Sequence, residues 1–363
     1  MSEIPSCLEV SLEPASGDFK VYLKDKLEKY YSFICKYNVD DKITYEIIKL
    51  NDFINSSIRS YYEGKVTESS LILFEYFEKN KIEKWLFTEN ITVNSEFYRS
   101  RYSPLRSNEK FDRKDLFHIN FKDRHKAASA RFSVPGLPAL YLGENSYVCH
   151  KESESHIEEL WFSKFTNRSV LVVLSLLKPS DFNLLLKRAD KGESISDELV
   201  RKYIVTYPLM MAASVKRSFK GEYFKPEYII PQVLSQYLVS SGNDKINGIK
   251  FPSTKISHGE IVDKNHLNKS YNYYFPVRGI KPVGYCDYIS SLFDISIPVN
   301  NELIGNIIYD DKMFKGLIAT DSFHKDCGRL IKINNEIECK FSRSVYGTIE
   351  AYVEEELELR SIN

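Results

Sequence analysis

Apolar residues recur at steps of three and four over the first ninety positions, which is the spacing of one helix face. Two successive segments carry such faces, which comprise Leu23, Leu27, Tyr30, Tyr31 and Ile34, then Ile43, Ile47, Leu50, Ile54, Ile58 and Tyr61. A third helix is expected from Val66 to Leu86, and its aromatic residues are Phe74, Phe77 and Trp85. No proline stands between Pro14 and Pro104 to interrupt these helices. The pattern predicts a helical bundle, whose aromatic faces form its own core or meet a partner or a second copy.

From about Phe97 the pattern changes to short apolar runs separated by proline and glycine, which is typical of strands. The continuous apolar run 170–177 predicts a central strand that is buried on both faces. Other strands are expected at 138–142, 246–253 and 273–277, and helices at 199–214 and 231–240. Alternation on both sides of Asn334-Asn335 predicts a hairpin within 330–341, before an acidic helical tail. The predicted fold class is α+β, with a mixed sheet.

Composition and charge exclude several classes of protein. The 363 residues are 43% apolar and carry 50 basic and 50 acidic side chains, which favours two or three folding units and argues against a surface built to hold phosphate backbones. The six cysteines are scattered without a CxxC pair, so we expect a reducing compartment and no metal site. No secretion signal or apolar run of 18 residues occurs, which predicts a cytoplasmic protein that does not span a membrane. The absence of Walker A and GxGxxG loops argues against a kinase, an ATPase or a Rossmann dehydrogenase.

Three polar residues are spaced evenly around the predicted strand 138–142. Arg131, Tyr141 and Glu152 follow one another at steps of 10 and 11 residues. An arginine can bind a diphosphate through its planar fork, a tyrosine can stack on a flat ring, and a glutamate can accept hydrogen bonds from a sugar or stabilise a developing cation. Together they suggest a site for a charged ligand that contains a ring. The alternative is a structural or surface ion pair, with Tyr141 in the core.

The segments RFSxPGxPALYLG at 131–143, PEYIIPQ at 226–232 and GIKFPS at 248–253, with the glutamate eleven residues beyond the tyrosine, resemble the RES domain family. The resemblance covers roughly residues 97–279. The family is named for an arginine, a glutamate and a serine, which fall here on Arg131, Glu152 and Ser253. Many members carry an arginine shortly after the serine, where this chain has Lys255.

The resemblance implies a mixed-sheet domain similar to the ADP-ribosyltransferase fold, and degradation of NAD as a substrate with no further cofactor. Water or inorganic phosphate would attack the ribose carbon once nicotinamide departs. Glu152 would hold the ribose and stabilise the cation, and Arg131 would fix the phosphates or the nicotinamide ribose. Tyr141 would shape the nicotinamide pocket, and Ser253 would orient Glu152 or the ribose. An early arginine is common in the family, which favours a substrate-binding role for Arg99. Arg101, on the same face of an extended segment, and Arg124, in a basic cluster, are further candidates for substrate binding.

We therefore expect three domains: a helical regulatory or assembly domain at 1–92, a RES catalytic domain at 93–280, and a C-terminal extension packed on it at 281–363. The expected partners are NAD, inorganic phosphate, an antitoxin or regulatory protein, and a second copy of the chain in a homo-oligomer. The resemblance implies a bacterial toxin or defence effector. Two alternatives stay open at this point, namely an enzyme that transfers ADP-ribose to a protein or nucleic acid, and a non-catalytic interaction protein.

Overall fold

The computed structural model describes residues 17–36, 39–80, 84–104, 110–178, 180–183, 197–217, 223–240, 245–257, 259–263, 268–300, 329–333 and 337–355. Two compact units alternate along the chain. The first unit comprises residues 1–89, 128–135 and 172–254, and the second unit comprises residues 90–127, 136–171 and 255–363. The three expected domains follow one another along the sequence, whereas each compact unit gathers separate segments, so the expected boundaries at 92 and 280 stay a prediction.

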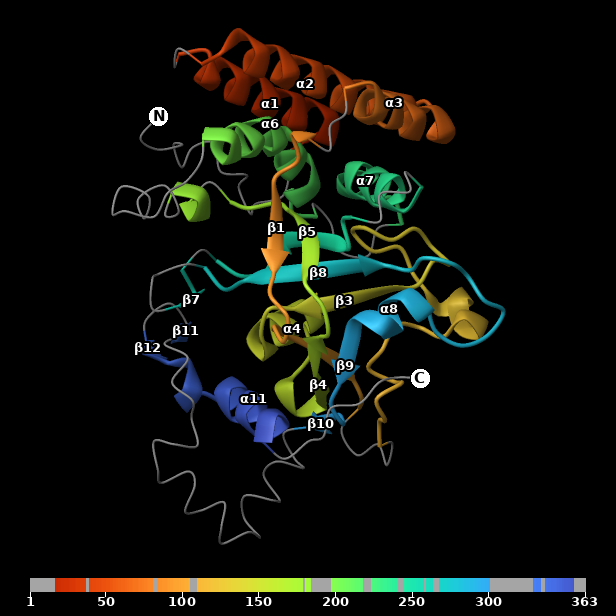
Figure 1. The fold of residues 1–363 in the computed structure, drawn as a ribbon, viewed down its shortest axis with the longest axis vertical. Coiled ribbons are helices and arrows are strands. Elements are labelled where there is room, and N and C mark those ends of the chain that lie inside the picture. The colour runs from red at the N-terminus through yellow and green to blue at the C-terminus, as the bar shows by residue number, and fades with distance from the viewer. Residues whose placement is uncertain are drawn as a thin grey trace, which may run out of the picture. The chain divides into compact units, whose positions relative to one another are not determined.

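The first unit begins with three helices, α1 (Phe19–Ile34), α2 (Asp41–Tyr62) and α3 (Val66–Lys79), which confirms the periodicity of the first segments (Figure 1). The side chain of Asp18 caps α1 by accepting from the Lys20 N–H at 2.7 Å. The predicted extension of the third helix to Leu86 is wrong. Asn80 ends α3: its backbone, with φ −94° and ψ 3°, leaves the α-helical region, and its side-chain amide donates to the Tyr76 carbonyl at 2.8 Å, a local bond typical of helix ends. Residues 81–83 lie outside the described residues.

Two later helices share a core with the first three. The predicted helices at 199–214 and 231–240 are α6 (Asp197–Ser214) and α7 (Ile229–Ser240). The hydroxyl of Tyr30 donates to the Ile204 carbonyl at 2.8 Å, and its ring lies 4.7 Å from that of Tyr207. The rings of Phe77 and Tyr237 also lie 4.7 Å apart. Tyr30 and Phe77 therefore pack against α6 and α7, whereas Tyr45 and Tyr62 are exposed, so the role of an interaction surface stays a prediction.

The same unit contains parallel strands. The strands β5 (Leu171–Ser175) and β6 (Gly248–Pro252) pair in register, with Val173 opposite Gly248 and Ser175 opposite Lys250. A third strand, β1 (Thr88–Ile91), precedes them in the chain. β5 confirms the predicted central strand, whose residues are buried except for Val172.

The second unit is built on antiparallel strands in the order β8 (Tyr271–Pro276), β3 (Ala139–Gly143), β2 (Glu96–Tyr102), β4 (Leu160–Asn167) and β10 (Val299–Asn300), with β9 (Phe293–Ile295) also paired to β4. β2 pairs with β4 along its whole length but with β3 at one position, Tyr98 opposite Gly143. A second sheet joins β7 (Ile261–Val262), β11 (Leu330–Ile333) and β12 (Ile337–Lys340). The antiparallel pairing of β11 with β12 confirms the predicted hairpin. The N-terminal helices are followed in the chain by strands that pair both parallel and antiparallel, which confirms the α+β class.

The described part of the second unit also contains the helices α4 (Ser146–Ser153), α8 (Asp287–Leu292) and α11 (Val345–Glu355), and the 3₁₀ turns η3 (Phe121–Lys126), η4 (Ile157–Glu159) and η6 (Phe341–Arg343). In the first unit, the 3₁₀ turn η5 (Pro226–Tyr228) directly precedes α7. Among the helices of the described segments, none is long and apolar enough to cross a membrane.

The helix α11 packs against the strands and α4 of the second unit. Its residues Ile349, Tyr352 and Val353 share a buried cluster with Tyr98, Cys149, Leu160, Phe162 and Val299. Glu350 is buried beside them, and its Oε1 accepts from the backbone N–H of Ser146 at 2.8 Å and from the hydroxyl of Ser146 at 2.9 Å. Its Oε2 accepts from Arg329. A carboxylate near the free N–H groups that begin a helix is stabilising, so Glu350 fixes the start of α4.

His118 gives the second unit a pH-dependent stability. The ring is buried, its Nε2 accepts from the Cys286 N–H at 2.9 Å, and its Nδ1 lies 2.8 Å from the Ile119 carbonyl, so the ring is neutral with its proton on Nδ1. Burial lowers the pKa of His118 to about 4, although the hydrogen bond to Ile119 acts in the opposite direction. Below an unfolded pKa near 6.5 the unfolded chain binds more protons, and stability falls as the pH falls.

We expect this histidine alone to remove about 2–3 kcal/mol of unfolding free energy between pH 7 and pH 4.5. Urea unfolding of the wild type and of His118→Gln across that range checks the expectation, since the Gln variant lacks the titrating group. Two parallel pH profiles would contradict it.

Candidate functional site

A cavity of about 230 Å³ lies in the second unit and is lined by residues of three strands and one helix. It is lined from β2, β3, α4 and β8 by Arg99, Ser100, Tyr141, Leu142, Gly143, Cys149, Glu152, Ser153 and Asn272. Three residues predicted as ligands, Arg99, Tyr141 and Glu152, are thus brought together in one cavity. β2 and β3 pair at a single position, and the cavity lies where their pairing stops, because strands that pair along their whole length leave no space between them.

The strand β3 places Tyr141 and lets α4 approach. Tyr141 lies opposite Tyr274 of β8, with ring centroids 5.2 Å apart. Gly143, two residues on, has no side chain between the strand and the helix. A Cβ at that position would lie 2.8 Å from the Sγ of Cys149, closer than such atoms approach in folded proteins. The glycine is therefore required for α4 to pack on the strand and to carry Glu152 to the cavity.

The carboxylate of Glu152 lies at the end of α4 and is oriented by two neighbours. The side-chain amide of Asn272 donates to its Oε1 at 2.8 Å. Lys255 donates to the backbone carbonyl of Glu152 at 2.6 Å, and its Nζ lies 3.6 Å from Oε2 and 3.0 Å from Oε1 of Glu154. The side chain of Glu152 is one-third exposed. A fixed carboxylate that a ligand can reach is suited to hydrogen bonding with a sugar or to stabilising a cation.

Arg99, in the middle of β2, brings a positive charge to the cavity. Its Nη1 is buried, and none of the described residues accepts a hydrogen bond from that nitrogen. Burial, together with the neighbouring charge of Arg101, lowers the pKa of Arg99 to about 10, so the guanidinium stays protonated at neutral pH. A buried donor without an acceptor is destabilising. An anionic group in the cavity would supply the acceptor, through the strong hydrogen bonds that guanidinium makes to phosphate and carboxylate.

Cys149 lines the cavity without being a nucleophile. Burial raises the pKa of its thiol to about 12, so the thiolate is not formed at neutral pH. The side chain instead belongs to the buried cluster under α11. The chemistry of the cavity therefore depends on its carboxylate, guanidinium and phenol.

Arg101 and Arg124, the other two arginines expected in the second unit to bind substrate, do not line this cavity. Arg101 donates to the Asp115 carbonyl at 2.7 Å, and its guanidinium lies 4.9 Å from the Phe111 ring centroid. Arg124 donates through Nε to the Gly136 carbonyl at 2.9 Å. Both side chains hold loops, and their role toward a substrate stays a prediction.

Arg131 and Ser253 belong to the first unit. Arg131 donates through Nη1 to the carbonyls of Ala213 and Val215, at 2.9 and 3.0 Å, and its guanidinium lies 5.3 Å from the Tyr228 ring centroid. It thus binds the carbonyls at the end of α6, where a cation is favoured by the helix dipole. Ser253 follows β6 and is fully buried. Their expected roles in NAD binding stay predictions.

Replacing Arg131 with lysine distinguishes a structural role of the guanidinium from a role in binding substrate. A lysine keeps the charge but loses the planar fork and its place beside Tyr228, and we expect the first unit to lose about 1–3 kcal/mol of stability. Thermal unfolding of Arg131→Lys measures the loss, with Arg59→Lys on the exposed face of α2 as the matched control. A variant with unchanged stability and impaired NAD turnover would instead indicate that the guanidinium acts mainly on substrate.

The sequence did not indicate Asn272 as a member of the site. This residue reaches the cavity because β8 pairs with β3, which sets it opposite Gly143. The available signal was an asparagine within the aromatic run Tyr271-Asn-Tyr-Tyr-Phe275, where a polar residue on a buried strand needs a partner. Its partner is the carboxylate of Glu152.

Comparison with known proteins adds one relationship. The chain is similar to a protein of Bacillus subtilis (strain 168) named "Putative toxin YopC". The two sequences are 30% identical over 271 residues, which is 70% of this chain and 59% of the relative, so the chain spans less than two thirds of the relative's length. No family model matches the chain, and no solved structure matches it. The similarity is thus to a protein that is named as a toxin, and the resemblance to the RES family stays a prediction.

Proposed function

We propose that this protein is a toxin that degrades NAD in the cavity of the second unit. The observation that carries the proposal is the meeting of Arg99, Tyr141 and Glu152 in one cavity, with the carboxylate oriented by Asn272. These groups match the parts of NAD that surround the scissile bond: a diphosphate, a flat nicotinamide ring and a ribose. The similarity to a protein named as a toxin also supports this proposal, because loss of NAD harms the cell that contains the enzyme.

The size of the cavity limits what it holds. Sites for drug-sized ligands usually measure about 300–1,000 Å³. A cavity of about 230 Å³ suits the nicotinamide and its ribose, and leaves the rest of the dinucleotide outside. Nicotinamide would lie against Tyr141, and the adjoining phosphates would supply the missing acceptor for Arg99.

The reaction breaks the bond between the nicotinamide nitrogen and the ribose C1′. The bonding electrons go to the ring nitrogen, so nicotinamide leaves as a neutral molecule and needs no acid to protonate it. Positive charge develops on the ribose, where the Glu152 carboxylate stabilises it and grips a ribose hydroxyl. An oxygen of water or of phosphate then bonds to C1′, and with water one proton is released to solvent. The products are nicotinamide and either ADP-ribose or its 1″-phosphate.

Incubation of the purified chain with NAD tests this proposal. We expect nicotinamide to appear with time, together with ADP-ribose in phosphate-free buffer or the phosphorylated product when inorganic phosphate is present. Mass spectrometry distinguishes the two acceptors. Intact NAD after prolonged incubation of a folded protein would contradict the proposal, and transfer of radiolabel from NAD to protein or nucleic acid would replace it by ADP-ribosyl transfer.

A further inference from the structure

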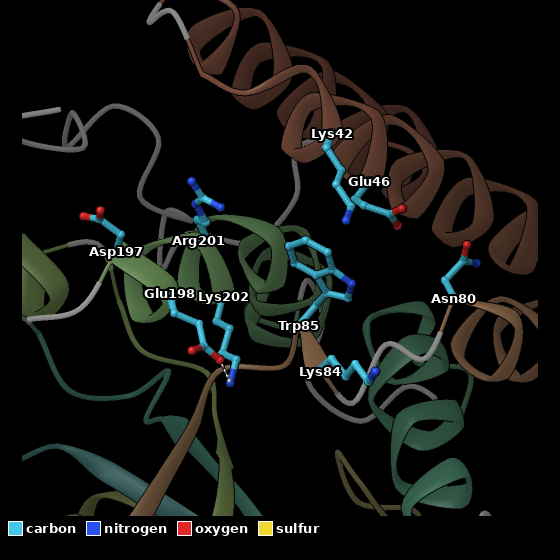
Figure 2. A pocket seen from close by; sticks show the side chains of 9 residues that line it. All are labelled: Lys42, Glu46, Asn80, Lys84, Trp85, Asp197, Glu198, Arg201 and Lys202. Carbon is cyan, nitrogen blue, oxygen red and sulfur yellow. Dashed lines mark ion pairs between the residues drawn. The ribbon is translucent and has the colours of Figure 1, made fainter.

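A second, larger cavity of about 680 Å³ lies in the first unit, between α2, the segment that follows α3 and the first turns of α6. Figure 2 shows the indole of Trp85 in its middle, with Lys42 and Glu46 of α2 on one side and Arg201 of α6 on another. The remaining lining residues are Asn80, Lys84, Asp197, Glu198 and Lys202. Its volume falls within the range of about 300–1,000 Å³ that is typical of small-molecule sites.

Trp85 offers this cavity a fixed aromatic surface. The hydroxyl of Thr206 donates to the Trp85 carbonyl at 3.0 Å and accepts from the Phe87 N–H at 2.8 Å, so α6 holds the backbone on which the indole stands. The indole is only partly buried, and the Nζ of Lys42 lies 5.6 Å from its ring. Tryptophans in cores are enclosed by apolar side chains, whereas this one stands among charged groups. An exposed indole next to a cation is a platform on which a flat ring can stack.

The charges around the indole favour an anion. The carboxylate of Glu198 pairs with Lys202 at 2.9 Å, and buried Glu46 accepts from the Tyr76 hydroxyl at 3.2 Å. Lys84 and Arg201 have neither ion pairs nor hydrogen bonds from their side chains to other described residues. Lys42, Lys84 and Arg201 thus present three cations, against two carboxylates that have no ion pair among the described residues, those of Glu46 and Asp197. Such cations beside an aromatic platform are the elements that bind a base together with its phosphate.

We propose that this cavity is a second ligand site, which binds a purine nucleoside monophosphate. The base stacks on Trp85, and the phosphate is bound by the cations Lys42, Lys84 and Arg201. A purine fits the platform better than a pyrimidine because its two fused rings match the area of the indole. The proposal does not depend on NAD degradation, since all lining residues belong to the first unit and binding can be measured without turnover.

The chain offers a direct reporter, because Trp85 and Trp161 are its two tryptophans. In a Trp161→Phe background the fluorescence comes from Trp85 alone. We expect AMP and GMP to quench it saturably, UMP to bind at least 5-fold more weakly, and adenosine or inorganic phosphate alone to bind at least 10-fold more weakly than AMP. Equal binding of phosphate and AMP would overturn the proposal, as would no saturable response to any mononucleotide at millimolar concentration.

Variants of the cations test the phosphate contact. Arg201→Gln and Lys84→Gln should each weaken AMP by about 10-fold and leave adenosine unchanged, because each removes a charged donor. Lys24→Gln, on the exposed face of α1 and paired with Glu28 at 3.7 Å, is the matched control and should bind AMP normally. Circular dichroism verifies that each variant is folded. Unchanged AMP affinity in both cation variants, or binding of an acidic aromatic peptide in place of AMP, would refute the assignment.

Discussion

Replacing Glu152 with glutamine is expected to slow NAD consumption by about 100- to 1,000-fold while the protein stays folded. The amide keeps the shape of the side chain and can still contact Asn272, but it removes the negative charge that would face the cationic ribose. The carboxylate is one-third exposed at the end of α4, so the substitution disturbs no core packing. The rate of nicotinamide release at saturating NAD is the measurement, with thermal unfolding as the check on folding.

Glu154→Gln is the matched control for this variant. Glu154 contacts the same lysine, Lys255, at 3.0 Å, but it does not line the cavity. We expect its rate to stay within about threefold of wild type, because surface ion pairs contribute little. A Glu152→Gln protein that releases nicotinamide as fast as wild type would exclude the carboxylate from the chemistry, and equal losses in both variants would attribute the effect to Lys255.

The second large effect is expected from Glu350→Gln, which should lower the stability of the second unit by about 3–5 kcal/mol. The substitution removes a buried carboxylate that accepts from Ser146 at two positions and pairs with Arg329. Breaking one side of a buried ion pair leaves the other charge without its compensation, in a place that water reaches poorly. Denaturant unfolding, followed by near-UV circular dichroism, measures the change.

Asp123→Asn provides the comparison, since the ion pair of Asp123 with Lys126 at 3.0 Å is more exposed and its loss should leave stability almost unchanged. Ser146→Ala separates the helix cap from the ion pair, because it removes the hydroxyl donor and keeps Arg329. If Glu350→Gln unfolds at the same denaturant concentration as wild type, then α11 does not fix the start of α4 in the way that its contacts indicate.

Local pattern predicted most of the elements. Steps of three and four identified α1 and α2, because one face of each helix is buried, and bounded apolar runs identified β3, β5, β6 and β8, because most residues of these strands are wholly or partly buried. The end of α3 was missed because the apolar spacing continues past Asn80, where the backbone leaves the helical conformation. Alternation around two asparagines was enough for the hairpin β11–β12, since strand pairing across a short turn is itself local.

The site was predictable only in part. Spacing and the RES resemblance named Arg99, Tyr141 and Glu152, which line one cavity. Asn272 stands 120 positions after Glu152, and only the register of β3 with β8 reveals their hydrogen bond. The contact of Arg131 with the carbonyls that end α6 is equally remote, because it spans 82 residues. Such contacts arise from the path of the chain in three dimensions, which periodicity does not encode.

The shared core of the early and late helices has a consequence for synthesis on the ribosome. Tyr30 donates to a carbonyl 174 residues further along the chain, and Phe77 packs on a ring of α7. At about 5–20 residues per second, α1 leaves the ribosome about 10–35 s before the carbonyl that Tyr30 needs. For that interval the aromatic faces of α1 to α3 have no enclosing neighbour from α6 or α7. These faces are apolar surface of the kind that chaperones bind, and the first unit cannot be completed before α7 has left the ribosome.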